Sequence, residues 1–280
     1  MLLTIIIINY NGAAFIRNCL DSVLSQRAFF NAFNVVVVDN ASTDDSIRVL
    51  NDYKDQIMII ENKINVGFSA AHNQLLDQLD TPYIWLLNND TEFNNTQDVI
   101  SPIIDYFNHH ETVVGISPKL LNTDGSLQNQ GSGLSSWAFK SKKIKAVGFL
   151  SGASLFIRTQ FFKDINGFDP NLFFYNDDFD FAMQVKKHHK TLIYFPMIEI
   201  THHGGLSTKF KPIETTIGGY YGSVYLCKKY YSNFIFLIYK FLIQRFIDFK
   251  LIYYFLNPTN VADDWKKELK KLKLKLKHEI

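Results

Sequence analysis

The sequence predicts an α/β fold with a mostly parallel central sheet flanked by helices, followed by a C-terminal helical appendage. In the first half, short β-branched runs alternate with helical patterns, which is typical of βαβ units. Polar turns follow the apolar runs, as they do at the ligand-binding edge of such a sheet. From Thr215 the pattern becomes helical and aromatic. We therefore expect two parts, residues 1–211 and residues 212–280.

Five near-continuously apolar runs predict buried strands. They are Ile5–Ile8, Val35–Val38, Ile57–Ile60, Tyr83–Leu87 and Val113–Ile116. The helices predicted between them are about Ala14–Ser25, Asp44–Tyr53, Ser69–Leu79 and Asp98–Asn108. Residues 121–145 lose periodicity and fill with Gly, Ser, Asn and Lys, which predicts a long loop or a flexible lid. The later elements expected are a strand near Ser154–Ile157, a helix from about Asp178 to His188, and short strands near Leu192–Phe195 and Glu199–Thr201.

The composition is that of a folded globular protein. The 280-residue chain is 47% hydrophobic and 20% charged, so it has enough apolar side chains for a large core. The net charge is +2, but residues 228–280 carry +7 and the rest of the chain −5. The basic charge is thus concentrated at the C-terminal end, and we expect no nucleic-acid partner.

The cysteines and the N-terminus favour a cytoplasmic protein. Cys19 and Cys227 are far apart and lack the spacing of metal ligands or of a disulfide framework. Residues 1–9 are apolar but have neither a basic leader nor a small-residue cleavage site. We interpret them as a first strand rather than a signal peptide.

The aromatic C-terminal region has two interpretations. Charged residues such as Lys240, Arg245 and Lys250 interrupt it, so no uncharged run reaches the roughly 18 to 20 residues that a membrane span needs. One interpretation is a helical hairpin packed on the domain or a homodimer contact. The other is peripheral contact with the inner face of the plasma membrane by an aromatic, basic surface.

Polar residues follow four of the apolar runs directly. They are Asn9–Gly12, Asp39–Ser42, Glu61–Asn62 with Asn65–Gly67, and Asn88–Asp90. Each is a common turn by itself, but four at one sheet edge indicate a ligand site. A single Gly12 replaces the Gly-x-Gly-x-x-Gly of dinucleotide folds, which argues against hydride transfer. Tyr10 and Asp39 suit stacking on a nucleobase and hydrogen bonding to a ribose.

Two acidic groups suggest catalysis. Asp90 is a natural ligand for Mg²⁺ or Mn²⁺ on a diphosphate, since these ions take one or two carboxylates plus phosphate oxygens. The alternative is that Asn88–Thr91 only forms a turn. Asp177, Asp178 and Asp180 begin a predicted helix, where acids complement the helix dipole, and crowding suits one of them to act as a general base.

Together these motifs resemble the inverting family 2 glycosyltransferases with the GT-A fold, especially the rhamnosyltransferase-like members. The resemblance runs from Ile5 to about Ser207. It is carried by Ile8–Gly12, Val38–Asp44, Asn65–Phe68, Leu86–Thr91, Ser151–Ala153, Gly167–Asp169, Phe173–Asp180 and His202–Gly205.

The resemblance implies a role for each motif. The residues that it assigns to the nucleotide are Tyr10, Asn11, Asp39, Asn65, Gly67, Asn73 and Asn89. Asp90 matches the last position of the family's Asp-x-Asp metal motif, and His202, rather than His203, matches a histidine that completes the metal site. Asp178 matches the catalytic base. Two residues depart from the usual pattern: Asn88 stands where many relatives have Asp, and Asp177 replaces Glu.

The implied reaction is a single displacement that inverts the anomeric carbon. It moves a sugar, rhamnose being one candidate, from a dTDP- or UDP-sugar to a glycan or lipid-linked acceptor in surface polysaccharide synthesis. A catalytically degenerate nucleotide-sugar-binding or scaffold subunit stays open as an alternative because of Asn88. Sugar nucleotidyl transfer is disfavoured, since residues 9–17 lack a Gly-rich basic phosphate loop.

Overall fold

The computed structural model describes residues 1–130, 133–173, 175–204 and 212–278. The chain divides into two compact units. The first, here called the α/β unit, comprises Met1–Pro170 and Asp177–Leu206; the second, the helical unit, comprises Asn171–Asn176 and Ser207–Ile280. Phe174, Gly205, Ser207 and the predicted boundary at residue 211 lie outside the described residues, so that boundary stays a prediction.

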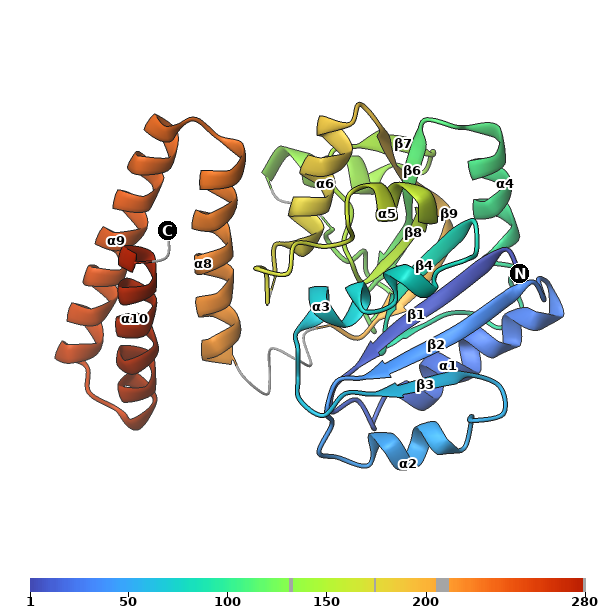
Figure 1. The fold of residues 1–280 in the computed structure, drawn as a ribbon, viewed down its shortest axis with the longest axis horizontal. Coiled ribbons are helices and arrows are strands. Elements are labelled where there is room, and N and C mark those ends of the chain that lie inside the picture. Colours follow the sequence, from blue (N-terminus) through green and yellow to red (C-terminus); the bar gives the residue numbers. More distant parts are fainter. Residues whose placement is uncertain (131–132, 174, 205–211, 279–280) are drawn as a thin grey trace. The chain divides into compact units, whose positions relative to one another are not determined.

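A mixed sheet forms the centre of the α/β unit (Figure 1). Its strands are β1 (Leu3–Asn9), β2 (Phe33–Asp39), β3 (Met58–Glu61), β4 (Tyr83–Asn88), β5 (Thr91–Glu92), β6 (Val113–Leu121), β7 (Lys145–Val147), β8 (Ser154–Arg158) and β9 (Thr191–His202). They are ordered β3-β2-β1-β4-β8-β6-β9-β5, with β7 also paired to β9. Neighbouring strands in the part β3-β2-β1-β4 are parallel, and β6 and β9 are parallel too. β8 runs antiparallel to both β4 and β6, so it joins the two parallel parts. The predicted α/β fold is confirmed.

Helices flank this sheet. They are α1 (Ile16–Ser25), α2 (Ser46–Asn51), α3 (Phe68–Asn73), α4 (Ser101–His109), α5 (Thr159–Asp164) and α6 (Asp177–Lys187). The helix expected to reach Leu79 ends at Asn73 and gives way to a 3₁₀ turn at Leu76–Gln78. The predicted loop at residues 121–145 is more ordered than expected, because it contains a bridge between Leu121 and Leu127, a 3₁₀ segment at Gly133–Lys140 and the start of β7.

The two short strands expected after residue 190 form the single strand β9. The pairing of β9 with β6 changes register, since Pro118 pairs with Phe195 and the next residue, Lys119, pairs with Glu199. Residues 196–198 therefore have no partner on β6. Pro196 lies in this gap, and proline has no N–H to donate to a strand ladder. The apparent break in the sequence pattern is thus an irregularity within one strand.

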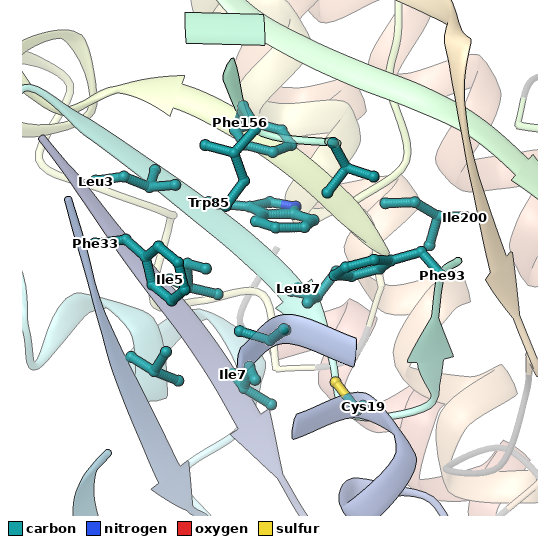
Figure 2. Close-up of a cluster of buried hydrophobic side chains, with 14 of the residues drawn as sticks. Leu3, Ile5, Ile7, Cys19, Phe33, Trp85, Leu87, Phe93, Phe156 and Ile200 are labelled. Carbon is teal, nitrogen blue, oxygen red and sulfur yellow. The ribbon is translucent and has the colours of Figure 1, made fainter. Parts of the chain in front are cut away.

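The core lies on both faces of the sheet, which explains the continuous apolar runs. In β1, Ile5 and Ile7 belong to one buried cluster and Ile6 to the other. Figure 2 shows the first cluster, where Trp85 stacks on Phe156 with ring centroids 4.3 Å apart. The Trp85 indole N–H also donates to Ser154 Oγ at 2.9 Å, so its polar atom is satisfied inside the core.

Arg158, the last residue of β8, holds the end of α4. Its Nε donates to the carbonyl oxygen of Val113 at 2.7 Å, and its Nη2 donates to the carbonyl oxygens of Phe107 and His110. The carbonyl groups at a helix C-terminus lack intrahelical partners and carry partial negative charge. The guanidinium group of Arg158 therefore supplies hydrogen-bond donors to carbonyl groups at the end of α4 and at the start of β6.

The helical unit contains α8 (Pro212–Tyr230), α9 (Asn233–Leu256) and α10 (Asn260–His278), each of which packs on the other two (Figure 1). Its core is a cluster of the buried residues Val224, Cys227, Phe236, Ile247, Leu269, Leu272 and Leu276. The short segment Asn171–Asn176 is tied to α8, since the Asn176 side chain donates to the carbonyl oxygen of Gly219 at 3.1 Å. Within the described residues, each helix is too short or too polar to span a membrane.

We expect Trp85→Ala to lower the free energy of unfolding by about 3 to 5 kcal/mol, because it removes a fully buried indole and leaves a cavity. Trp137 is the matched control, since it is 72% exposed, and Trp137→Ala should change stability by less than about 0.5 kcal/mol. Urea unfolding followed by circular dichroism measures both. Equal destabilisation by the two variants would contradict the assignment of the core.

Candidate active site

The buried amide of Asn9 joins three strand ends at the carboxyl edge of the sheet. Asn9 is the last residue of β1, and its Nδ2 donates to Asp39 Oδ1 at 2.8 Å at the end of β2. Its Oδ1 accepts a hydrogen bond from Asn89 Nδ2 at 2.7 Å, just after β4. Asp39 also accepts from the Ser42 hydroxyl at 2.6 Å and from the Ser42 backbone N–H at 2.9 Å. The structure thus brings the predicted nucleotide residues Asp39 and Asn89 together through Asn9.

Gly12 lies directly against this network. A Cβ at Gly12 would come within 2.1 Å of Asn89 Nδ2 and 2.3 Å of Asn9 Oδ1, so only glycine fits. Asn11 adopts a positive φ of 50°, which asparagine tolerates better than most residues. Its side-chain oxygen accepts from the Thr43 N–H at 2.7 Å and fixes the loop after β2. Tyr10, between them in sequence, is half-buried at the same edge.

A second set of amides shapes the loop between β3 and α3. Asn40 donates to Asn65 Oδ1 at 2.9 Å and accepts from the Val66 N–H at 3.1 Å. Asn65 Oδ1 also accepts from the Gly67 N–H at 2.9 Å, and Gly67 has a φ of 84°, which favours glycine. The predicted residues Asn65 and Gly67 therefore form one turn held by the end of β2.

Asn73, the last residue of α3, uses its side chain within the protein. Its Nδ2 donates to the carbonyl oxygen of Phe168 at 2.7 Å, and its Oδ1 accepts from the Phe168 N–H at 2.9 Å. A Cβ at Gly167 would clash with this amide at 2.2 Å. Asn73 thus positions the Gly167–Phe168 turn, and its predicted contact with the nucleotide stays a prediction.

Buried Asp90 and half-buried His202 face each other. Asp90 follows β4, His202 ends β9, and the pairing of Thr91 with His202 across β5 and β9 brings them together. The distance between Asp90 Oδ1 and His202 Nε2 is 3.2 Å. His203 points elsewhere: its Nε2 lies 3.3 Å from Glu92 Oε1, and its ring packs against Phe15. Asp90 thus lies beside His202 and not His203, and the assignment of His202 to a metal site stays a prediction.

Gln128 holds a proton on Nδ1 of the His202 ring. Gln128 Nε2 donates to Asn122 Oδ1 at 3.1 Å and to the carbonyl oxygen of His202 at 3.2 Å. Its Oε1 is therefore the atom that faces His202 Nδ1, at 2.7 Å, and it must accept a hydrogen bond there. With the proton on Nδ1, Nε2 of a neutral ring presents a lone pair towards Asp90. Asn88 Nδ2 lies 3.2 Å from the same Nε2.

This arrangement fits a divalent cation. A carboxylate oxygen and an imidazole lone pair that face each other need a positive charge between them, either a proton or a metal. An octahedral ion with bonds of about 2.1 Å places adjacent ligand atoms about 3.0 Å apart, close to the observed separation. The described residues contain no group of three or more His, Cys, Asp or Glu that could hold a metal by themselves. Asp90 and His202 would thus need further ligands from a phosphate or from water.

Two acids begin α6. Asp177 is buried, and its burial together with the nearby charge of Asp178 raises its pKa to about 8. Asp178 is half-buried, and burial raises its pKa to about 6, although hydrogen bonds from the Phe179 and Gly152 backbones limit this rise. Tyr175 and Asn176, just before them, both have positive φ, so the chain turns sharply into the helix. At neutral pH Asp178 is the acid better able to accept a proton.

Gly152 and Ala153 link the acids to the end of β4. The Asn88 N–H donates to the carbonyl oxygen of Ala153 at 2.9 Å. A Cβ at Gly152 would lie 3.9 Å from both Asp177 Oδ2 and Asp178 Cβ. Two adjacent residues before β8 therefore contact both the Asn88–Asp90 turn and the start of α6. The predicted metal ligand and the predicted base lie at the same edge of the sheet.

Two cavities in the described part of the chain do not include the predicted site residues. One, of about 530 Å³, is lined by residues of α1, β5 and β9, including Asp21, Glu92 and Glu199. The other, of about 360 Å³, lies at the opposite ends of the strands, near Thr4 and Asn34.

Four residues of this network were not singled out from the sequence. Asn9, Asn40 and Ser42 belong to the polar turns after β1 and β2, so their positions were visible, but the number of hydrogen bonds that each makes was not. Gln128 carried no signal, because it lies in a segment predicted to be a loop and meets His202 across 74 residues of sequence.

Comparison with known proteins identifies relatives of the chain. A family model described as glycosyl transferase family 2 matches residues 4–165. The teichoic acid poly(glycerol phosphate) polymerase of Staphylococcus epidermidis is 35% identical over 117 residues, which cover 36% of this chain but only 16% of the polymerase. The N-acetylglucosaminyl-diphospho-decaprenol L-rhamnosyltransferase of Mycobacterium tuberculosis is 22% identical over 226 residues, covering 69% of this chain and 73% of that enzyme.

Solved structures agree on the fold. Staphylococcus aureus TarS residues 1–349 superpose with a TM-score of 0.63 at 15% identity, covering 100% of this chain and 92% of that one. A complex of the same TarS fragment with UDP-GlcNAc gives a TM-score of 0.59 at 17% identity, covering 99% and 81%. GalNAc-T7 with UDP, GalNAc and Mn²⁺ gives 0.59 at 15% identity, covering 72% and 44%. The fold is the predicted GT-A fold.

The raised pKa of Asp177 predicts a pH-dependent change in stability. A carboxyl group that keeps its proton to about pH 8 in the folded state binds more protons than in the unfolded state, so the folded state loses stability as pH rises from about 4 to 8. Asp177→Asn removes this loss and should raise the thermal midpoint, relative to the unmodified chain, more at pH 8 than at pH 5. Asp55→Asn, at an exposed acid, should show no such difference. The same gain at both pH values would contradict the raised pKa.

Proposed function

Since the chain belongs to glycosyl transferase family 2, we propose that it transfers a sugar from a UDP- or dTDP-sugar to a hydroxyl group of a glycan or lipid-linked acceptor. The observation that carries this proposal is the pair formed by buried Asp90 and half-buried His202, 3.2 Å apart at the carboxyl edge of the sheet, with Asp178 at the same edge. The reaction proposed is a single displacement with inversion at the anomeric carbon.

The nucleotide is assigned to the ends of β1, β2 and β3. Asn9 and Ser42 hold the Asp39 carboxylate in place, so it can accept hydrogen bonds from a ribose or a base without reorganising. Tyr10, at the same edge, offers an aromatic ring for stacking on the base. Asn11 and Asn89 support this edge from the β1 and β4 sides.

The diphosphate is assigned to Asp90 and His202 through Mg²⁺ or Mn²⁺. When bound, the ion neutralises the negative charge that develops on the leaving diphosphate. Asp90 supplies a carboxylate oxygen, and His202 supplies the Nε2 lone pair that Gln128 orients from the other side of the ring. Asn88, where many family members have Asp, contributes an amide beside the same nitrogen rather than a second carboxylate.

Asp178 is proposed as the general base. It takes the proton of the acceptor hydroxyl while that oxygen bonds to the anomeric carbon, and the electron pair of the broken bond leaves with the diphosphate. A pKa of about 6 suits this step, since the carboxylate is mostly ionised at neutral pH and still basic enough to take a proton. Activity should therefore rise with pH through about 6.

The relatives suggest the substrates to test first. The M. tuberculosis relative is a rhamnosyltransferase acting on a diphospho-decaprenol-linked sugar, and a TarS neighbour holds UDP-GlcNAc. We propose dTDP-rhamnose and UDP-N-acetylglucosamine as the first donors, and a lipid-linked or polymeric glycan of the cell surface as the acceptor. Synthesis of such a glycan would take place at the inner face of the plasma membrane.

Asp178→Asn should lower release of the nucleoside diphosphate from its donor sugar by about 10²- to 10⁴-fold, because it removes the proton acceptor and keeps the shape of the side chain. The nucleotide should still raise the thermal midpoint in the presence of Mn²⁺ as it does for the unmodified chain. Asp77→Asn, at an exposed acid, is the control. Unchanged turnover in Asp178→Asn would exclude it as the base, and the absence of any nucleotide-dependent shift in the unmodified chain would contradict the proposed function.

Gln128→Leu should weaken Mn²⁺ binding in the presence of UDP by about 10- to 100-fold, because the His202 ring loses the acceptor that holds its proton on Nδ1. Gln128→Glu keeps an acceptor and should retain most of the affinity. Gln97→Leu, at an exposed glutamine, is the control. Binding is measured by the loss of the free Mn²⁺ signal in electron paramagnetic resonance. Equal affinities for Gln128→Leu and the unmodified chain would show that Gln128 does not orient His202.

A further inference from the structure

The outer face of α9 is apolar along the whole helix. Its two fully packed residues, Phe236 and Ile247, lie on the side that faces α8 and α10. Large apolar side chains are exposed on the opposite side at spacings of three and four residues, so they form one continuous stripe. We call them the α9 face: Phe234, Ile235, Leu237, Ile238, Phe241, Leu242, Phe246, Phe249, Ile252, Tyr253, Phe255 and Leu256.

A stripe of this size needs a partner. The helix has 24 residues and is therefore about 36 Å long, and Phe255 at its end is 76% exposed. Scattered exposed apolar residues are normal on a protein surface, but a contiguous apolar patch of this extent marks an interaction site. Helix α10 has no such stripe. Among its described residues after the first turn, Leu274 is the one large apolar side chain that is exposed. The apolar stripe is therefore a feature of α9.

Cations lie within and beside the α9 face. Arg245 stands one turn from both Phe241 and Phe249, and its guanidinium lies over the Phe241 ring at 5.4 Å. Lys240 and Lys250 lie over the rings of Phe236 and Phe246, each at 5.6 Å. Arg245 is thus an exposed cation within the α9 face, as arginine often is where an apolar phase meets water, whereas Lys240 and Lys250 are half-buried beside it.

The charge of the helical unit indicates which partner fits. Residues 212–278 contain twelve Lys and Arg against five Asp and Glu, a net charge of +7. Asp248 is shared by Arg245 and Lys273, so even this cluster keeps a net positive charge. A second copy of the chain docked through the same face would bring Arg245 and its neighbours close to their own copies. A partner that is apolar inside and negatively charged at its surface matches both properties.

We infer that the α9 face docks the chain on the surface of a lipid bilayer that contains anionic headgroups, with α9 lying in the plane of the interface. Its apolar side chains enter the boundary between headgroups and acyl chains, and the lysines and arginines contact the headgroups. The inference depends on the helical unit alone and not on the chemistry proposed for the α/β unit, so each can fail without the other.

The test is flotation of the full-length chain with vesicles. Binding to vesicles of phosphatidylcholine with phosphatidylglycerol should be strong, should weaken with added sodium chloride, and should be much weaker with phosphatidylcholine alone. The variant Phe241→Gln, Phe249→Gln, Ile252→Gln, which changes exposed side chains in the middle of the face, should bind at least about tenfold more weakly. The variant Lys240→Gln, Arg245→Gln, Lys250→Gln should lose about fivefold for each charge removed.

The matched control changes the same number of exposed apolar residues in the α/β unit: Met58→Gln, Trp137→Gln, Met197→Gln. This variant should bind as the unmodified chain does. Circular dichroism shows whether each variant folds. Vesicle binding by the α9 variant equal to that of the control would overturn the inference. The inference would also be overturned if light scattering showed that the unmodified chain is a dimer and the α9 variant a monomer, while neither of these two proteins bound vesicles.

Discussion

The hydrogen bonds of the Asn9 side chain are the constraint on which the candidate site depends. Parallel pairing aligns the ends of β1, β2 and β4 at one edge, but it does not by itself orient the side chains there. The buried Asn9 amide donates to Asp39 and accepts from Asn89, so one side chain sets the positions of two others on neighbouring strands. Because a buried amide without partners costs free energy, these three side chains are ordered together or not at all.

Around this edge, burial gives similar groups different chemistry. Asp39 is buried but surrounded by donors, whereas Asp177 is buried next to another carboxylate, which raises its pKa. Asp178, half-buried beside it, is left as the more easily ionised acid. The Asp90 carboxylate has an imidazole nitrogen as its neighbour instead. The same residue type thus suits a nucleotide contact, a metal contact and a proton acceptor at one sheet edge.

The sequence predicted much of this arrangement for physical reasons that can be named. Strands with both faces buried, such as β1, leave continuous apolar runs, and the turns after them are visible as polar clusters. The antiparallel insertion of β8 between β4 and β6 could not be predicted, because strand order depends on long-range pairing that leaves no local pattern. For the same reason Gln128 was missed: its importance arises from a contact with His202 that only the paired structure creates. The stripe on α9 was visible as aromatic composition, but which residues face outwards depends on the packing of three helices.

The separation of the site residues along the chain also bears on how the protein is made. Asn88 and His202 are 114 residues apart, and they meet only when β9 has paired with β6 and β5. The Asn9–Asp39–Asn89 network, by contrast, is complete once β4 has left the ribosome. During synthesis the Asn9–Asp39–Asn89 network can therefore form before the Asp90–His202 pair, because closing the long loop between β4 and β9 costs entropy that only the β6–β9 pairing offsets. A nascent chain accordingly lacks the Asp90–His202 pair until nearly the whole α/β unit has emerged.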